Sequence, residues 1–351
     1  MGLSSSTTGC GESSFLYIGK NKDKIMTHTQ NNSASLEKRK LGKTDLEIVP
    51  LVLGGNVFGW TVDKETSFAL LDGFADAGFN TIDTADMYSA WVPGNQGGES
   101  EAIIGEWLNK DRTRREKMII ITKVGAPLGE VRTGLSEKHI LNAAEASLRR
   151  LRTDYIDVYF SHFPDDQTPQ EETLRAYEKL IQQGKVRVIG ASNYSVEQLK
   201  EAFRVSADAN LPRYEVLQPE YNLYDRTSYE GELCDLAVKE GLGVITYYSL
   251  ASGFLTGKYR SKEDLGKSAR GGGVEKYLDA RGLRILDALD KVAEAQNAQL
   301  AEVALAWIIA REGVTAPIAS ATSMEQLQSL IRSAHLKLTP ENITLLNEAS
   351  L

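Results

Sequence analysis

The chain has 351 residues, of which 42% are hydrophobic and 25% charged, and its formal net charge is −8. This is the composition of an ordinary globular protein, and the acidic balance argues against nucleic acid or an anionic membrane surface as the main partner. No apolar run approaches the roughly 18 residues that span a bilayer, so we expect no membrane segment.

The first 36 residues differ in composition from the remainder. They are rich in Ser, Thr, Gly and Asn and have no helical or strand period, which predicts a disordered leader over 1–36, native or added. Residues 1–6 match the N-myristoylation pattern, with Cys10 as a second lipid site. A translation start at Met26 or an added leader is the favoured interpretation. No basic segment precedes an apolar core, so no secretory signal is expected.

Cys10 and Cys234 are the two cysteines of the chain, and they are far apart. Without a CxxC pair they cannot form a metal site of the zinc-ribbon type. Two free thiols in a reducing compartment are the simplest interpretation, which favours a cytoplasmic protein without a bound metal.

From about residue 45, apolar runs of strand length alternate with amphipathic segments of helical length. The strands are expected at 48–53, 79–82, 118–122, 155–160, 186–190, 215–218, 243–248 and 316–319. The helices are expected at 65–76, 100–108, 136–151, 171–183, 196–203, 231–239, 283–296, 301–311, 324–332 and 342–349.

This alternation predicts the fold class. Near-continuous apolar strands are typical of a parallel sheet covered on both faces. Eight such strand–helix units in one domain, over 37–351, indicate a closed (β/α)8 TIM barrel. A Rossmann domain is disfavoured because no Gly-x-Gly-x-x-Gly follows any expected strand.

Polar residues stand at the carboxyl ends of these strands, where the active sites of such barrels lie. Each of them alone is more often structural than functional, but the barrel brings all these ends to one mouth. They are Asp83 with the nearby Tyr88, Lys123, Ser161 with His162, Ser192 with Asn193, Gln218, and Tyr248 with Ser249.

Four of these residues suit acid catalysis on a carbonyl. A free tyrosine has a pKa of about 10, and a nearby cation such as Lys123 is expected to lower it. Asp83 would hold the lysine, Tyr88 would donate the proton, and His162 would orient the carbonyl oxygen. Such a site reduces carbonyls when hydride reaches the carbon, and a nicotinamide cofactor supplies that hydride. Asp86 is assigned no chemical role and is expected to shape the loop.

The motifs that carry these residues resemble the aldo-keto reductase family over about residues 38 to 335. They are "GFNTIDTADMY", "ITKVG", "DYIDVYFSHFP", "GASNYS", "LQPEYN" and "YYSLASGFLTGKY", in the family's order and spacing. The resemblance is to the bacterial-type branch that also contains potassium-channel β subunits. It implies that Asp83, Tyr88, Lys123 and His162 form the catalytic tetrad.

The resemblance also implies where the nicotinamide cofactor binds. The carboxamide would contact Ser192, Asn193 and Gln218, with Tyr248 stacked on the ring. The pyrophosphate would lie along a segment that contributes Ser249, Leu250, Gly253, Leu255 and Lys258. The adenosine end would approach Ser320, Thr322 and Gln326.

The sequence departs from the family pattern at that adenosine end. Thr322 and Gln326 stand where relatives that bind NADPH often have arginine. A phosphomonoester favours bidentate arginine, although hydroxyl groups and a helix N-terminus also bind phosphate. NADP(H) is the expected cofactor, and NAD(H) remains the alternative.

The expected substrate is a small carbonyl compound or, in the reverse direction, an alcohol or sugar. Asn56, Trp60, Trp91 and Phe163 are the expected pocket walls, although the two tryptophans would serve equally to seal the barrel mouth. Two other functions stay open. Some family members are redox-sensing regulatory subunits with slow turnover, and a barrel lyase would use Lys123 as a Schiff base, which leaves Asp83 and Tyr88 unexplained.

Overall fold

The computed structural model describes residues 36–126 and 134–351. Within them, eight parallel strands close into a barrel in the order β10-β3-β4-β5-β6-β7-β8-β9. The prediction of a (β/α)8 barrel is therefore confirmed. The strands are β3 (Val52–Gly54), β4 (Thr81–Asp83), β5 (Ile119–Val124), β6 (Ile156–Ser161), β7 (Val186–Ser192), β8 (Val216–Gln218), β9 (Gly243–Thr246) and β10 (Ala316–Ala319).

The pairing register sets which residues reach the barrel mouth together. Asp83, the last residue of β4, pairs with Gly54 of β3 and with Ile121 of β5. Ser192, the last residue of β7, pairs with Gln218, the last residue of β8. The strand ends that carry the polar residues thus lie side by side.

A short antiparallel hairpin of β1 (Arg39–Lys40) and β2 (Glu47–Ile48) precedes the barrel. Its apolar residues join the side chains of the barrel interior in one buried cluster, which includes Leu41 and Ile48. At Gly42 (φ 64°) an added Cβ would lie 2.4 Å from the backbone nitrogen of Gly243 in β9, so the turn requires glycine. The hairpin therefore packs directly against the amino-terminal end of the strands.

This hairpin was not predicted from the sequence, from which 48–53 was expected to form a single strand. In the structure Ile48 ends β2 and β3 begins at Val52, with Pro50 between them. Proline has no N–H to donate to a sheet, which accounts for the break between the two strands.

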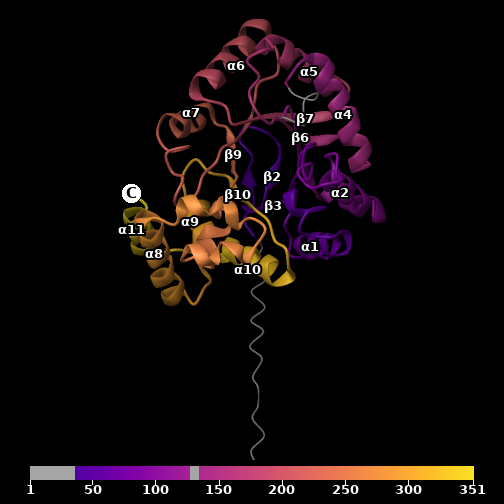
Figure 1. Cartoon of the computed structure of the whole chain (residues 1–351). Helices are drawn as coiled ribbons and strands as arrows, with labels where there is room; N and C mark the ends of the chain where they lie inside the picture. Colours follow the sequence, from indigo (N-terminus) through magenta and orange to yellow (C-terminus); the bar gives the residue numbers. More distant parts are fainter. Residues whose placement is uncertain (1–35, 127–133) are drawn as a thin grey trace, which may run out of the picture. The chain divides into compact units, whose positions relative to one another are not determined.

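Helices surround the barrel strands (Figure 1). Their first turns have the expected caps: Ser195 and Gln198 form a capping box at α6, and the Ser323 hydroxyl accepts a bond from Gln326 N at α10. The α-helices are α1 (Lys64–Asp76), α2 (Glu99–Lys110), α3 (Thr113–Lys117), α4 (Glu137–Leu151), α5 (Gln170–Gln182), α6 (Val196–Ala209), α7 (Glu232–Glu240), α8 (Ala280–Gln296), α9 (Leu300–Ile309), α10 (Met324–His335) and α11 (Pro340–Ala349).

The connection from β9 to α8 is the longest in the described part of the barrel. It contains four short 3-10 helices: η2 (Ala251–Thr256), η3 (Lys262–Lys267), η4 (Gly271–Gly273) and η5 (Glu275–Tyr277). The chain then forms α8, which packs against both α9 and α11. Residues of this connection, among them Leu250 and Lys258, reach the barrel mouth.

One expectation falls outside this description, and another is checked against the described helices alone. A disordered leader with a lipidation pattern was predicted for 1–36. Of these residues, 1–35 lie outside the described part of the chain. Among the helices that the structure describes, none has the length and apolar character that crossing a membrane requires.

Candidate active site

A cavity of about 1090 Å³ opens at the carboxyl ends of the strands. A volume of this order accommodates a dinucleotide together with a small second molecule. Its wall includes residues from β3, β4, β7, β10 and the long β9–α8 connection, and three members of the expected tetrad, Asp83, Tyr88 and His162, contribute to it.

Lys123 contacts two residues of the cavity wall, Asp83 and Tyr88, and bonds to three oxygens. Its Nζ donates to Asp83 Oδ2 at 2.7 Å, to the Thr84 carbonyl at 2.7 Å and to the Tyr88 hydroxyl at 3.0 Å. The Tyr88 hydroxyl is also 3.4 Å from Asp83 Oδ2. The three side chains expected to act together are therefore in direct contact.

The pKa of Tyr88 is shifted in the direction opposite to the one expected from the sequence. Burial and the adjacent Asp83 carboxylate raise the pKa of Tyr88 well above its usual value, whereas Lys123 was expected to lower it. The reason is that the lysine charge is already paired with Asp83 in a site closed to solvent. Burial likewise lowers the pKa of Lys123, and Asp83 opposes that shift. At neutral pH Tyr88 therefore carries its proton.

His162 faces Tyr88 across the cavity, with 6.1 Å between the ring centroids and an interplanar angle of 72°. Burial and the nearby Lys123 charge lower the pKa of His162 well below its usual value, so the imidazole is neutral at pH 7. Its Nδ1 is buried and bonds to no group in the described part of the chain.

The amide-bearing residues lie beside the tetrad. Gln218 Nε2 donates to Asp83 Oδ1 at 2.9 Å, and Ser192 Oγ donates to the Gln218 carbonyl at 2.9 Å. Asn193 Nδ2 donates to the His162 carbonyl at 2.9 Å. Ser192 and Asn193 line the cavity, whereas Gln218 lies behind Asp83 and is not part of the wall.

Tyr248 has the most exposed of the aromatic rings here, with 50% of its surface accessible, and it lines the cavity. Tyr248 (φ 51°) and Asn193 (φ 62°) both have left-handed backbone angles, which are unusual for residues other than glycine. The Asn222 side chain stabilises the backbone at Tyr248 by donating to the Tyr248 carbonyl at 3.1 Å. Such local strain is frequent at binding sites.

The remaining residues expected for the cofactor fall into two groups. Those that line the cavity are Leu250, Gly253, Lys258, Ser320, Thr322 and Gln326. Ser249 and Leu255 are buried and face away from the cavity wall; Ser249 Oγ donates to the Thr246 carbonyl at 3.0 Å. Ser249 and Leu255 thus support the turn of η2 and contribute no surface to the cavity wall.

The expected substrate walls are only partly brought together. Asn56, Trp91 and Phe163 line the cavity, and the Phe163 ring stacks on His162 with 5.0 Å between centroids. Trp60 does not line the cavity and instead packs edge-to-face on Trp91 at 5.5 Å. Asn56 accepts a bond from Ser320 Oγ at 2.7 Å, which places it on the side expected for the cofactor.

Two residues at this site were not selected from the sequence. The Tyr247 hydroxyl donates to Asn193 Oδ1 at 2.7 Å and so fixes the amide orientation; its position next to Tyr248 at a strand end was an available signal. Arg270, in the β9–α8 connection, lines the cavity, and nothing in that glycine-rich segment indicates where its side chain points.

Comparisons with known proteins identify the family of this chain. The aldo/keto reductase family model matches residues 50–350. An uncharacterized oxidoreductase of Bacillus subtilis, YrpG, is 35% identical over an alignment of 323 residues that covers 89% of this chain and 95% of the relative.

Two plant relatives bear the name "probable voltage-gated potassium channel subunit beta". The Arabidopsis thaliana protein is 34% identical over 308 residues, covering 85% of this chain and 91% of the relative. The rice protein is 34% identical over 317 residues, covering 87% and 94%. With the family model over most of the chain, these matches show that the protein belongs to the aldo/keto reductase family, whose members are oxidoreductases that use NAD(P)H.

Proposed function

We propose that this protein is an NADP(H)-dependent oxidoreductase that reduces aldehydes or ketones to alcohols, or catalyses the reverse oxidation, with Tyr88 as the general acid. The observation that carries the proposal is the position of the Tyr88 hydroxyl. It lies 3.0 Å from Lys123 Nζ, at a cavity that His162 also lines. A phenol, a buried cation and a neutral imidazole at one cavity wall suit proton delivery to a carbonyl oxygen.

The proposed roles follow from the protonation states. Tyr88 keeps its proton at neutral pH because burial and Asp83 raise its pKa. As a carbonyl oxygen gains negative charge, the nearby Lys123 cation stabilises the phenolate that proton donation leaves behind. Neutral His162 donates a hydrogen bond to the same oxygen and orients it. Asp83 keeps Lys123 charged and in place.

The cavity fits a nicotinamide cofactor, which supplies the hydride when it is bound. Ser192 and Asn193 offer a hydroxyl and an amide suited to the carboxamide, and Tyr248 presents a free ring face. Lys258 is the cation on the η2 side of the cavity and is suited to phosphate. These are the residues of this chain that would hold the two ends of such a molecule.

The preference between the two nicotinamide cofactors depends on the N-terminus of α10. Thr322 N and Oγ1 are 2.8 and 3.1 Å from Gln326 Oε1, so both side chains lie together at the start of this helix. Hydroxyl groups at a helix N-terminus suit a 2′-phosphate. We assign NADP(H) on this basis, with NAD(H) as the alternative.

The alternatives have less support. The channel-subunit names belong to the plant relatives and suggest a regulatory role with slow turnover. The contacts of the tetrad favour catalysis, and turnover far below about 1 s⁻¹ with every carbonyl tested would favour regulation. A Schiff-base lyase is disfavoured because Lys123 Nζ is buried and bonded to three oxygens.

The proposal is tested by fluorescence titration with NADPH and NADH, followed by a panel of aldehydes and ketones monitored at the nicotinamide absorbance. We expect saturable binding of NADPH and carbonyl-dependent oxidation of it. Tight cofactor binding without turnover on any member of the panel would refute the catalytic proposal and retain the binding one.

A further inference from the structure

The hydroxyl groups of Thr84 and Ser100 form a buried pair that the proposed mechanism does not use. Thr84, the residue after β4, donates from Oγ1 to Ser100 Oγ in the first turn of α2 at 2.8 Å. Ser100 Oγ in turn donates to the Gly55 carbonyl, just after β3, at 2.8 Å. Both side chains are fully buried. The pair therefore joins α2 to the ends of two barrel strands.

Thr84 connects this pair to Lys123. The Thr84 backbone carbonyl accepts a bond from Lys123 Nζ at 2.7 Å, and the same Nζ lies 3.0 Å from the Tyr88 hydroxyl. The Thr84 N–H donates to the Ile121 carbonyl of β5 at 2.8 Å. Because the N–H and the hydroxyl of Thr84 are both bonded, the carbonyl that accepts from Lys123 has a fixed orientation.

The next residue of α2 holds the neighbouring strand. Glu101 Oε1 accepts from the Thr122 hydroxyl of β5 at 2.6 Å, and Glu101 Oε2 accepts from Arg150 Nε of α4 at 2.6 Å. Thr122 directly precedes Lys123 in the chain. The first turn of α2 thus contacts both the strand that carries the lysine and the residue whose carbonyl the lysine bonds.

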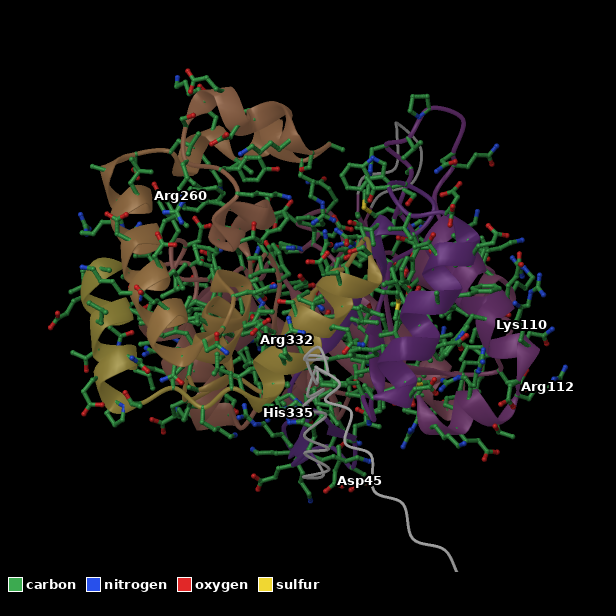
Figure 2. The ribbon with its side chains drawn as sticks, turned by 90° about the horizontal axis from the view of Figure 1, so that it is seen from below. Asp45, Lys110, Arg112, Arg260, Arg332 and His335 are labelled. Carbon is green, nitrogen blue, oxygen red and sulfur yellow. The ribbon has the colours of Figure 1, made fainter. Side chains whose placement is uncertain are left out.

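These buried polar contacts are confined to the start of α2. Its last residue, Lys110, is exposed, and Figure 2 shows it at the edge of the molecule, whereas Ser100 and Glu101 are fully buried. A buried polar side chain costs free energy unless it is bonded. Packing alone does not require hydroxyl groups here, because two apolar groups of the same shape are nearly as stable as a bonded pair.

We propose that Ser100 is a positioning residue for the reaction: its bond with Thr84 fixes the carbonyl that holds the Lys123 ammonium beside Tyr88. The inference rests on the proposed function, because it concerns the lysine of the same site. A carbonyl acceptor favours the charged form of Lys123, and that charge stabilises the phenolate which proton donation leaves behind. Without the Ser100 hydroxyl, the Thr84 carbonyl is less firmly oriented and the lysine loses part of this support.

Other charged or titratable groups also face Lys123 from the elements around it. They are Asp83, Tyr88, Asp86, Glu101 and His162. Burial lowers the pKa of Lys123, and the carboxylates among these groups oppose that shift. All of them stay unchanged when Ser100 or Thr84 is substituted, so a change in the titration of Lys123 then reports on the Thr84 carbonyl.

The test measures how kcat depends on pH, with saturating NADPH and 4-nitrobenzaldehyde, an aldehyde that does not itself titrate. Turnover falls at high pH when Lys123 loses its proton, because a neutral amine no longer stabilises the phenolate. We expect Ser100→Ala to lower kcat at pH 7 by about 10-fold and to move this high-pH limb down by about 0.5 to 1 pH unit. The affinity for NADPH should stay within about 2-fold.

Thr84→Val tests whether the effect passes through the hydroxyl pair. It removes the hydroxyl that donates to Ser100 and keeps the shape of the side chain, so it should move the high-pH limb in the same direction. The double variant Ser100→Ala/Thr84→Val should shift the limb no further than Ser100→Ala alone, because each substitution removes the same bond.

Ser67→Ala is the matched control. Ser67 is a fully buried serine near the start of α1, which packs against α2, and its Oγ donates to the Asp63 carbonyl at 2.6 Å. The variant therefore loses a buried hydroxyl of the same kind in a different helix. Its high-pH limb should stay within about 0.2 pH unit of the wild type, because a loss of stability alone does not move a titration.

Two results would overturn the inference. One is a high-pH limb that Ser100→Ala leaves where Ser67→Ala leaves it. The other is a double variant whose shift is the sum of the two single shifts, which would mean that Ser100 does not act through Thr84. Should Ser100→Ala fail to fold, Thr84→Val decides alone, and an unchanged limb in that variant overturns the inference.

If the wild-type protein reduces no aldehyde or ketone, the proposed function fails, and urea denaturation decides the inference instead. A lower folded-state pKa of Lys123 destabilises the fold below the unfolded value of about 10.4. Each pH unit of that shift makes the unfolding equilibrium constant at pH 7 about 10-fold larger, and the excess should shrink at pH 9.5. A Ser100→Ala deficit that shrinks in this way, while the Ser67→Ala deficit stays constant, supports the inference. A Ser100→Ala deficit that is equal at both pH values overturns it.

Discussion

Asp83 and Lys123 form an ion pair almost entirely removed from solvent, with 2.7 Å between Oδ2 and Nζ and exposed side-chain fractions of 2% and 0%. The pair joins the end of β4 to β5, and Gln218 from β8 bonds to the second oxygen of Asp83. A buried ion pair stabilises a fold little overall, but the loss of one partner leaves an uncompensated charge. Removal of either partner is therefore expected to destabilise the folded protein.

The first prediction concerns Asp83→Asn, which keeps the shape of the side chain and removes its charge. We expect the free energy of unfolding at pH 7 to fall by about 3 kcal/mol or more, measured by urea denaturation. Without Asp83 the folded-state pKa of Lys123 falls further below its unfolded value, so stability is lost as the pH drops below about 10.4. The deficit should therefore shrink between pH 7 and pH 9.5.

The double variant Asp83→Asn/Lys123→Met is the control for that interpretation. Because it removes both charges, it should recover part of the stability that Asp83→Asn loses. An Asp83→Asn deficit that is the same at both pH values, with no recovery in the double variant, would contradict the charge-pair account.

The second prediction concerns Tyr88→Phe, which removes the proposed proton donor. General acids typically contribute 10²- to 10⁴-fold to rate, so we expect kcat to fall by about 10³-fold. The fluorescence-measured affinity for NADPH should stay within about 2-fold, because the hydroxyl is assigned to the carbonyl and not to the cofactor. Full turnover in this variant with a good aldehyde would show that the acid is another group.

Tyr159→Phe is a matched control for Tyr88→Phe. Tyr159 is a fully buried residue of β6 whose hydroxyl bonds to no group in the described part of the chain. Removing this hydroxyl should leave kcat within about 2-fold of the wild-type value. The substitution also removes an unsatisfied buried polar group, whose burial costs about 1 kcal/mol or more. Reduced turnover in both variants would indicate a general packing effect of losing a hydroxyl.

The barrel and the convergence of the tetrad could be predicted because both depend on strand ends. Uninterrupted apolar runs place the strands, and closure brings Asp83, Lys123 and His162 to one mouth, whatever the helix boundaries are. The hairpin before the barrel was missed because β1 and β2 are two residues each and have no readable period.

The electrostatics and the loop geometry of the site could not be predicted in the same way. The direction of the Tyr88 pKa shift depends on burial and on the sharing of Lys123 with Asp83, neither of which a sequence pattern specifies. The position of Arg270 depends on the path of a connection made of 3-10 turns, where no hydrophobic period constrains the side chains.

The third prediction concerns the pH dependence of stability. The folded-state pKa of His162 is well below its usual value, whereas the unfolded chain titrates near 6.5. Below that pH the unfolded state binds the proton more readily, so stability falls as the pH drops, by at most about 1.4 kcal/mol per pH unit. His162→Asn should reduce this dependence, measured by urea denaturation at pH 7.5 and 5.5. If the free energies of unfolding of the wild type and the variant differ by the same amount at both pH values, the prediction is contradicted.

The fourth prediction concerns Thr322→Arg at the start of α10. A guanidinium here would meet a 2′-phosphate, and a charge-assisted bond of about 1.5 kcal/mol corresponds to roughly 10-fold tighter NADPH binding. NADH lacks this phosphate, so its affinity should stay within about 2-fold. Titrations at two salt concentrations provide the check, because the gain for NADPH should shrink at high salt. An equal gain for both cofactors would place the 2′-phosphate elsewhere.

The fifth prediction tests the close packing of α2 on α4, two helices of the ring around the barrel. At Gly105 an added Cβ would lie 2.0 Å from the Arg150 carbonyl oxygen and 2.7 Å from the Leu151 Cα. Both are backbone atoms, so the helices must separate to admit it. Alanine favours a helix by about 1 kcal/mol over glycine, but the clash outweighs this gain.

We therefore expect Gly105→Ala to lower the free energy of unfolding by about 2 kcal/mol, measured by urea denaturation. Gly266→Ala is the control, because a Cβ there meets no heavy atom within 4 Å and its φ is not positive. It should change stability by less than about 0.5 kcal/mol. A Gly105→Ala protein as stable as wild type would mean that α2 and α4 are farther apart than the structure has them.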